Sequence, residues 1–353
     1  MKAITWYNRK YNNGGIAFPP VTTIYCGMAE TPSLGPRPGV DYPRTLEEFH
    51  EFFPDEANCL RYLERLRWPQ GFVCPVCEHQ GTPWRLRRQL LMCPACQRQT
   101  SVTAGTLFAG TRSALRLWLL AAWEITSRKS GASALGVQRT LGLASYKTAW
   151  AWLHKLRRAM VRPGRDLLAQ RVEVDECYVG GEEEGVRGRE TYRKAIVAIA
   201  VELTERNRIA RIRLRHVPDL TAKSLVGFVT DVVEAGSIVE TDGWLGYSPL
   251  DKAGFEHRVS KLSASTDPAH VVMPHVHRVA SLLKRWLLGT HQGAISNAQL
   301  PYYLDEFTFR FNRRTSSARG LLFYRLLCHA VQIEPVPIKA LFQNAGRGPR
   351  KRG

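Results

Sequence analysis

The chain of 353 residues is long enough for two or three domains, and its hydrophobic content of 44% excludes a globally disordered protein. A formal net charge of +19 is typical of proteins that bind a polyanion, of which nucleic acid is the commonest. No apolar run is long enough to span a bilayer, and residues 1–7 lack the apolar core of a signal peptide, so we expect a cytoplasmic protein without a membrane partner.

The N-terminal region begins without a regular pattern. Residues 1–42 contain scattered glycines and prolines, and we expect a poorly ordered leader outside any domain. Thr45 then precedes two glutamates, which predicts a helix over 45–53, and a second helix is expected over about 56–66. These helices open a domain that we expect to cover residues 43–110.

Two CxxC pairs separated by fifteen residues predict a metal site. The four cysteines are Cys74, Cys77, Cys93 and Cys96. Thiolates at this spacing can surround one structural Zn²⁺ tetrahedrally and leave no ligand position open for chemistry. The alternative, a redox-active pair, needs a thioredoxin-like βαβ pattern that the flanking sequence lacks. The other four cysteines are scattered and are expected to be buried thiols.

Residues 111–162 have the pattern of helices. Apolar side chains at helical spacing predict a helix over 114–127, a short helix over 133–141 and, after a glycine-containing turn, a longer helix over 145–159. This order is the helix-turn-helix pattern of DNA-binding proteins, although a helical spacer between two domains would look the same. Basic residues here and between the CxxC pairs are the candidate contacts to DNA phosphates: Arg85, Arg87, Arg88, Lys147, Lys155, Arg157 and Arg158.

After residue 168 the apolar pattern alternates with period two, which predicts strands. Three strands, a helix and a fourth strand follow one another, which is the order of a ribonuclease-H-like sheet; they are expected over 171–179, 192–202, 209–217, 221–234 and 237–241. A loop over 256–276 and helices over 276–288 and 299–312 come next. The whole predicts a multidomain α+β protein: N-terminal helices and a zinc ribbon, a helix-turn-helix, a ribonuclease-H-like α/β domain over 168–330, and a basic tail over 331–353.

Two carboxylates lie in the interior of the first of these strands. Asp175 and Glu176 stand among good strand formers, and burying a carboxylate without a partner costs several kcal/mol. A salt bridge or an exposed strand edge would explain them as well as a metal ion would. Asp242 follows the strand over 237–241, and it would lie beside Asp175 if the first and fourth strands are neighbours. Carboxylates paired in this way suit the hard cations Mg²⁺ or Mn²⁺.

Five blocks of sequence carry a resemblance to a known family. They are Val172-Glu173-Val174-Asp175-Glu176-Cys177-Tyr178-Val179-Gly180-Gly181, Thr241-Asp242-Gly243-Trp244-Leu245-Gly246-Tyr247, and the stretches 275–286, 289–293 and 303–314. In their order and spacing the chain resembles the bacterial insertion-sequence transposases that couple a zinc ribbon to a DDE-type, ribonuclease-H-like domain. The likeness runs over about 46–342.

The resemblance implies a catalytic site. Asp175 and Asp242 would be the first two acidic metal ligands, and His277 stands where many such enzymes have Glu or Asn. Lys284, two helical turns after His277, shares its face, and Lys284 and Arg285 would bind DNA near the scissile phosphate. This looks like an Asp-Asp-His-Lys variant known in the family. The resemblance further implies metal-dependent cleavage and joining of DNA, binding of the element's inverted-repeat ends and of target DNA, a homo-oligomer on DNA, and association with the nucleoid.

Some alternatives stay open at this point. His277 can be a structural residue at a helix start, with His275 or Glu306 as the third ligand, and Asp305-Glu306 can equally form a structural pair. The missing third carboxylate also fits a decayed copy that only binds DNA through its ribbon and helix-turn-helix. A metal-dependent nuclease on the same sheet would explain the carboxylates, but not the ribbon or the final helices.

Overall fold

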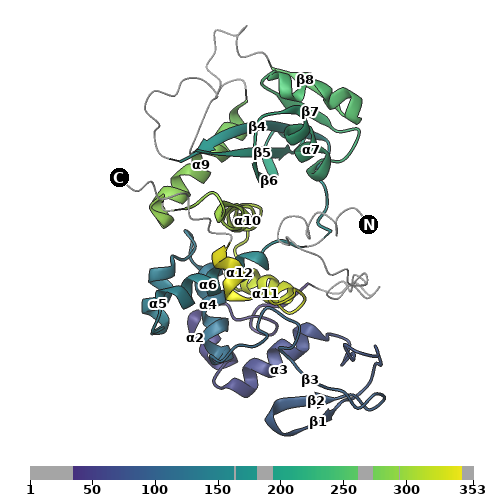
Figure 1. Ribbon diagram of the computed structural model, residues 1–353, viewed down its shortest axis with the longest axis vertical. Helices are drawn as coiled ribbons and strands as arrows, with labels where there is room; N and C mark the ends of the chain where they lie inside the picture. Colours follow the sequence, from purple (N-terminus) through teal and green to yellow (C-terminus); the bar gives the residue numbers. More distant parts are fainter. Residues whose placement is uncertain (1–34, 163, 181–193, 261–272, 294, 344–353) are drawn as a thin grey trace. The chain divides into compact units, whose positions relative to one another are not determined.

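The computed structural model describes residues 35–162, 164–180, 194–260, 273–293 and 295–343 (Figure 1). The chain forms two compact units: unit 1 holds the described residues up to Gly164 together with Ser316–Leu341, and unit 2 holds the described residues of Arg165–Thr315 together with residues 342–343. Among the described residues, no helix combines the length and the apolar character needed to cross a membrane.

Unit 1 begins with two helices that side chains cap. Thr45 accepts the Glu48 N–H and begins α2 (Leu46–Phe52), and Asp55 accepts the Asn58 N–H and begins α3 (Glu56–Arg67). A three-stranded antiparallel sheet follows, built from β1 (Trp84–Arg85), β2 (Leu90–Met92) and β3 (Gln99–Ser101), with the 3-10 turn η1 (Arg87–Gln89) between the first two strands. This small sheet is the predicted ribbon.

Three helices form the predicted helix-turn-helix region. Helix α4 (Leu115–Ser127) packs against α5 (Ala134–Leu141) and α6 (Tyr146–Arg158), and the indoles of Trp118 and Trp152 stack at 4.2 Å between ring centroids. Gly142 ends α5 in the left-handed conformation, with φ of 64°, and Ser145 then caps α6 through its hydroxyl. The short helix, turn and longer helix therefore exist as the sequence indicated.

Helix α11 (Arg319–Ala330) corrects the predicted boundary of the second domain, which placed residues up to 330 with the sheet. It packs against α3 and α4 of unit 1, and Phe323 is fully buried among the rings of Phe49, Phe53 and Trp123. The apolar face of α11 completes a core that α2 to α4 leave open. The tail expected over 331–353 is wrong for its first part, since Val331, Ile333 and Leu341 are buried and belong to unit 1, and Ile338–Gln343 form α12; residues 344–353 lie outside the described part.

The end of the expected leader also belongs to unit 1. Tyr42 is 3% exposed, and the Asp41 carbonyl accepts a hydrogen bond of 2.8 Å from the Tyr62 hydroxyl. The neighbouring Pro43 carbonyl lies so close to Gly320 of α11 that a Cβ there would stand 1.8 Å from its oxygen. The boundary predicted at 42 is therefore too late, since residues 41–43 pack against this unit; residues 1–34 lie outside the described part.

Unit 2 is built on a five-stranded sheet in the order β6-β5-β4-β7-β8. Strands β4 (Arg171–Val179), β5 (Ala195–Leu203) and β6 (Ile209–Val217) pair antiparallel, and β7 (Ile238–Thr241) pairs parallel to β4. This order and these directions confirm the ribonuclease-H-like sheet. The parallel strand β8 (Glu256–Val259) was missed, because its four residues alternate weakly and lay within an expected loop.

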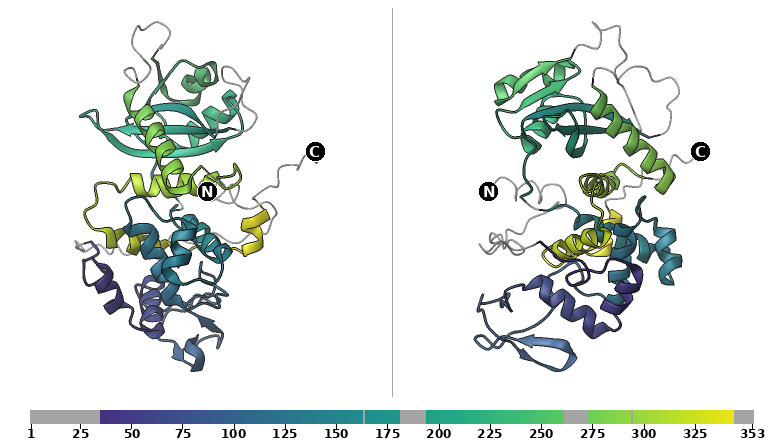
Figure 2. Two further views of the ribbon diagram at one scale, coloured as in Figure 1. Left: turned by 90° about the vertical axis from the view of Figure 1, so that its left-hand side faces the viewer. Right: turned by 180° about the vertical axis from the view of Figure 1, so that it is seen from behind.

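Helices cover both faces of this sheet. Helices α9 (Pro274–His291) and α10 (Leu300–Phe311) pack on the face that carries Cys177, Val197 and Ile199, and α9 lies across the strands in the left view of Figure 2. Helix α7 (Ala222–Val232) and the 3-10 segment η2 (Leu245–Ala253) pack on the face that carries Val172 and Val174. Alternate residues of β4 therefore face different helices, which decides the role of each of its carboxylates.

Candidate active site and zinc centre

The two predicted aspartates lie on neighbouring strands. Strands β4 and β7 run parallel with Glu173 opposite Glu240, and Asp175 and Asp242 each come two residues after this last registered pair. Asp242 is the first residue after β7, and its Oδ1 accepts the Trp244 N–H at 3.0 Å, which fixes the carboxylate at the strand end. The condition on which the predicted site depended, adjacency of the first and fourth strands, is confirmed.

Helix α9, which packs on one face of the sheet, contributes His277 and Lys284. The Nδ1 atom of His277 lies 3.7 Å from Oδ2 of Asp175, and the side chains are 30% and 14% exposed, respectively. Lys284 is exposed two turns further along α9. Burial raises the pKa of the Cys177 thiol in β4 to about 12, and the ammonium of Lys284 opposes this rise, so Lys284 acts on the same end of the strand. Asp175, Asp242, His277 and Lys284 thus share one region of unit 2.

Glu176, which neighbours Asp175 in sequence, belongs to the opposite face of the sheet. Its Oε2 accepts a hydrogen bond of 3.1 Å from the hydroxyl of Tyr247, a fully buried residue of η2. Burial and the nearby carboxylates raise the pKa of Tyr247 well above its usual range, which keeps the phenol protonated as a donor. The two adjacent carboxylates therefore have separate roles, and Glu176 ties β4 to the segment that follows Asp242.

Glu173 is a residue of this region that the sequence analysis did not single out. Its side chain is 2% exposed, and one oxygen accepts the backbone N–H groups of His275 and Val276 at 3.1 and 2.9 Å. The other oxygen lies 2.7 Å from Nδ1 of His275, whose Nε2 meets the Asn207 carbonyl at 3.0 Å. Glu173 thus caps the start of α9, two turns before Lys284, and it holds His275 away from the role of third metal ligand that was left open for it.

Replacing Glu173 by alanine should destabilise unit 2 by about 3 kcal/mol, because two N–H donors of α9 and the His275 ring lose their buried acceptor. The isosteric Glu173→Gln should cost far less. Its amide oxygen can still accept both backbone N–H groups, while its NH₂ donates to a neutral His275 ring whose Nε2–H keeps the Asn207 carbonyl. Thermal unfolding followed by circular dichroism would compare the two variants with the parent. Equal losses in both would contradict the cap.

Glu306, the other candidate for the third metal ligand, is a buried residue of α10. It is fully buried, Asp305 beside it is 3% exposed, and α10 packs against β6, which is two strands away from β4. The sequence gives no signal for the burial of this pair, because an Asp-Glu pair on an amphipathic helix has the same pattern whether it is buried or exposed.

The four cysteines of the ribbon form a compact cluster. Their sulfur atoms all lie within 4.8 Å of one another, with Cys74 and Cys96 at 3.6 Å and Cys77 and Cys93 at the same separation. A tetrahedral Zn²⁺ with Zn–S bonds of about 2.3 Å requires sulfur atoms about 3.8 Å apart, so the cluster fits this ion. In each knuckle a residue in the left-handed conformation follows the second cysteine, Glu78 with φ of 59° and Gln97 with φ of 58°.

The predicted DNA contacts differ in exposure. Arg87, Arg88, Lys147, Lys284 and Arg285 are exposed, as such contacts must be. Lys155 is only half-buried and lies over the Trp118 ring, at 5.8 Å from its centroid.

Two of the predicted contacts are buried. Arg157 and Arg158 are 1% and 6% exposed, in contrast to the other basic residues of this set. The sequence pattern did not indicate this burial, because basic residues normally mark a solvated face. The exposed part of α6 is its first turn, with Tyr146 at 50% and Lys147 beside it.

Comparisons with known proteins agree with this division of the chain. Residues 54–99 match a family described as the transposase zinc-ribbon domain, and residues 167–312 match one described as the ISXO2-like transposase domain. The chain is also 28% identical, over 282 aligned residues, to a Halobacterium salinarum protein described as an uncharacterized protein in transposable element ISH50; the alignment covers 73% of this chain and 91% of that protein.

A zinc ribbon in one unit and a DDE-type sheet in the other define an insertion-sequence transposase architecture. The two matched segments together cover more than half of the chain. Each unit thus contains a segment that matches a transposase domain family, the zinc-ribbon domain in unit 1 and the ISXO2-like domain in unit 2.

Proposed function

We propose that the protein is the transposase of an insertion sequence, which binds the inverted-repeat ends of its element and catalyses metal-dependent cleavage and transfer of DNA strands. The observation that supports this proposal is the parallel pairing of β4 with β7, whose register, continued beyond its last pair, would bring Asp242 next to Asp175, while Nδ1 of His277 in α9 lies 3.7 Å from Oδ2 of Asp175. A sheet of this kind has no structural need for two adjacent carboxylates at one end, and both would repel DNA unless cations neutralise them.

The residues suit divalent cations of the hard type. Two carboxylates from neighbouring strands and one imidazole make a donor set that Mn²⁺ accepts well, and Mg²⁺ accepts its oxygens. Among the described residues, the four cysteines are the one set of three or more such ligand atoms gathered within 4.8 Å, so the Asp175, Asp242 and His277 set is more open than the zinc centre. Bound cations would supply activation of the attacking hydroxyl and stabilisation of the leaving oxygen.

The chain's own residues then have the following roles. Asp175 and Asp242 hold the cations, and His277 either completes their coordination or orients the DNA phosphate. Lys284 and Arg285 bind the backbone beside the scissile phosphate, while exposed basic residues of unit 1 hold the element's end. Since two ends must be brought together before transfer, the protein acts on DNA as at least a dimer.

The test is cleavage and joining of a labelled duplex that carries the element's ends, in Mg²⁺ and separately in Mn²⁺. We expect nicked ends and products joined to a second DNA, both dependent on the metal. Cleavage without joining would favour a nuclease, and end binding without any cleavage would favour a protein that only binds DNA.

The variant His277→Ala separates the two roles of the histidine. A metal ligand should, when removed, lower activity in both metals by at least about a hundredfold, since several kcal/mol of stabilisation is lost. A loss of about tenfold or less in Mn²⁺ would assign His277 to orienting the phosphate.

A further inference from the structure

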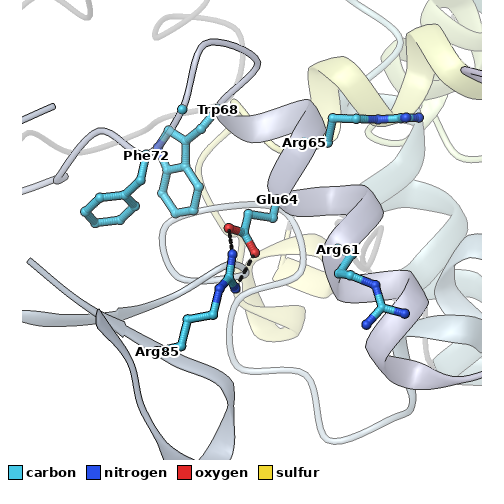
Figure 3. A pocket seen from close by; sticks show the side chains of 7 residues that line it. Arg61, Glu64, Arg65, Trp68, Phe72 and Arg85 are labelled. Atoms are coloured by element: carbon cyan, nitrogen blue, oxygen red, sulfur yellow. Dashed lines mark hydrogen bonds and ion pairs between the residues drawn. The ribbon is translucent and has the colours of Figure 1, made fainter. Parts of the chain in front are cut away.

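Polar contacts between residues far apart in the sequence fasten elements together in both units. In unit 1, the guanidinium of Arg85 in β1 donates to both carboxylate oxygens of Glu64 in α3, at 2.7 and 3.0 Å (Figure 3). The Arg85 side chain is 67% exposed, so this ion pair is solvated and screened by salt. In unit 2, Glu173 of β4 makes the comparable contact to the start of α9, but its side chain is 2% exposed. This buried contact is the one that neighbours the proposed catalytic residues Asp175 and His277 along the chain.

Helix α9 has no cap from its own N-cap residue. It begins at Pro274, and the N-cap residue Met273 makes no side-chain hydrogen bond to the first turn. The first N–H groups of a helix lack partners within the helix. Here the N–H groups of His275 and Val276 both donate to one oxygen of Glu173, at 3.1 and 2.9 Å. A strand residue therefore does the work of the missing cap, which fixes the start of α9 directly to β4.

The other oxygen of Glu173 is held by a network that reaches two further elements. It lies 2.7 Å from Nδ1 of His275, and Nε2 of that ring lies 3.0 Å from the carbonyl oxygen of Asn207 in the β5–β6 turn. The Asn207 side chain accepts a hydrogen bond of 3.1 Å from Arg171, which also pairs with Glu240 of β7 at 2.9 and 3.0 Å. Because these contacts join β4, β7, the β5–β6 turn and α9, the Glu173 carboxylate has a defined place and α9 must start where the carboxylate is.

The connection from this carboxylate to the proposed site is short on both sides. Glu173 and Asp175 are two residues apart in β4, so their side chains leave the strand on the same face, which α9 covers. His277 directly follows the capped Val276, and its Nδ1 lies 3.7 Å from Oδ2 of Asp175. A change in the reach of the Glu173 side chain would therefore move His277 relative to Asp175. A displacement of about 1 Å in an active site can lower a rate by about a hundredfold.

We propose that Glu173 is a positioning residue of the catalytic site: the length of its side chain sets where His277 lies relative to Asp175. His275 supports this role by tying the Glu173 carboxylate to the β5–β6 turn. The proposal rests on the proposed function, which makes His277 a member of the site. It requires the length of the side chain at position 173, and it does not require the negative charge.

Two variants separate length from charge. Glu173→Asp keeps the charge but withdraws the carboxylate by one C–C bond, about 1.5 Å. Glu173→Gln keeps the length without the charge, and its amide can still accept both N–H groups and donate to a neutral His275 ring. The first measurement is an NMR spectrum of the zinc-loaded protein without DNA or added divalent cation, with labelled histidine side chains. The His277 ring signals are assigned among those of the ten histidines with His277→Ala. Glu173→Asp should shift them more than Glu173→Gln does, and the reverse order would overturn the proposal.

The second measurement is the single-turnover rate of cleavage of the element's end. Glu173→Asp should lower this rate at least about tenfold and leave the affinity for the end within about twofold of the parent, while Glu173→Gln should stay within about threefold of the parent rate. In a His277→Ala background, Glu173→Asp should lower the rate by at most about threefold more, since it acts through His277. Losses that multiply in the double variant would contradict this route.

The matched control is Val229→Ala. Val229 is a fully buried residue of α7 on the opposite face of the sheet, so the substitution should lower the melting temperature but leave the His277 ring signals and the cleavage rate unchanged. An equal loss of rate in this variant would reduce the effect of Glu173→Asp to stability and overturn the proposal. If the parent cleaves no DNA, the proposed function fails and the ring signals still decide the positioning. If the parent cleaves and Glu173→Asp matches it in rate, the function stands and the positioning role fails.

Discussion

Replacing Asp242 by asparagine should lower DNA cleavage and joining by at least about 10³-fold, since a catalytic cation supplies several kcal/mol of charge stabilisation and each 1.4 kcal/mol is tenfold. Asparagine is a fitting substitution because its amide oxygen can still accept the Trp244 N–H that Oδ1 of Asp242 accepts at 3.0 Å. The turn after β7 should therefore keep its shape. Thermal unfolding and end binding should match the parent, which separates lost chemistry from lost folding. Asp175→Asn should behave alike.

The control for this experiment is the next residue along β4. Glu176→Gln removes a carboxylate adjacent in sequence to Asp175, yet its side chain faces Tyr247 on the other side of the sheet. The amide can keep the hydrogen bond from the phenol, so activity should stay within about tenfold of the parent. If Glu176→Gln and Asp175→Asn lost activity equally, the assignment of roles by face of the strand would be wrong. Full activity in Asp242→Asn would sink the proposed site.

Sequence patterns predicted the sheet well because its strands obey one simple rule. The bounds of β4 and β6 are those expected, since apolar residues alternate there and Gly180 and Pro218 end the two runs. The adjacency of Asp175 and Asp242 could be stated only as a condition, because pairing between strands 67 residues apart in sequence is a property of the whole sheet. The assignment of Asp175 and Asp242 to one site came from the family resemblance of the sequence blocks, because periodicity alone does not show which strands pair.

Tertiary packing decided the features that were missed. Nothing local distinguishes α11 from the helices of unit 2, and its place in unit 1 follows from where Phe323 finds an apolar partner. Arg157 and Arg158 had the appearance of a solvated basic face, yet the fold encloses them. Glu173 could have been suspected, because a carboxylate in a strand interior needs donors, and the first N–H groups of a helix are a ready source.

Removing zinc should unfold the ribbon while the sheet of unit 2 stays folded. Structural zinc contributes about 10–16 kcal/mol of apparent binding free energy in small zinc domains at neutral pH, which far exceeds what strands of two or three residues can supply. The chelated protein and the variant Cys93→Ser should both lose β1 to β3 and the Arg85–Glu64 ion pair that fastens them to α3. Binding of the element's end should weaken strongly in both.

Zinc content and structure should change together in this experiment. Elemental analysis of the parent should give about one zinc per chain, as expected for four thiolates around one ion, and close to none for Cys93→Ser. Cys177→Ala is the control, because this thiol is buried, has its pKa raised to about 12 and is no part of the cluster. The zinc content of this variant should equal that of the parent. The core of unit 2 draws on its own strands and helices, so it should still melt cooperatively after chelation. If chelation instead abolished the thermal unfolding transition of the whole chain, the two units would fold as one.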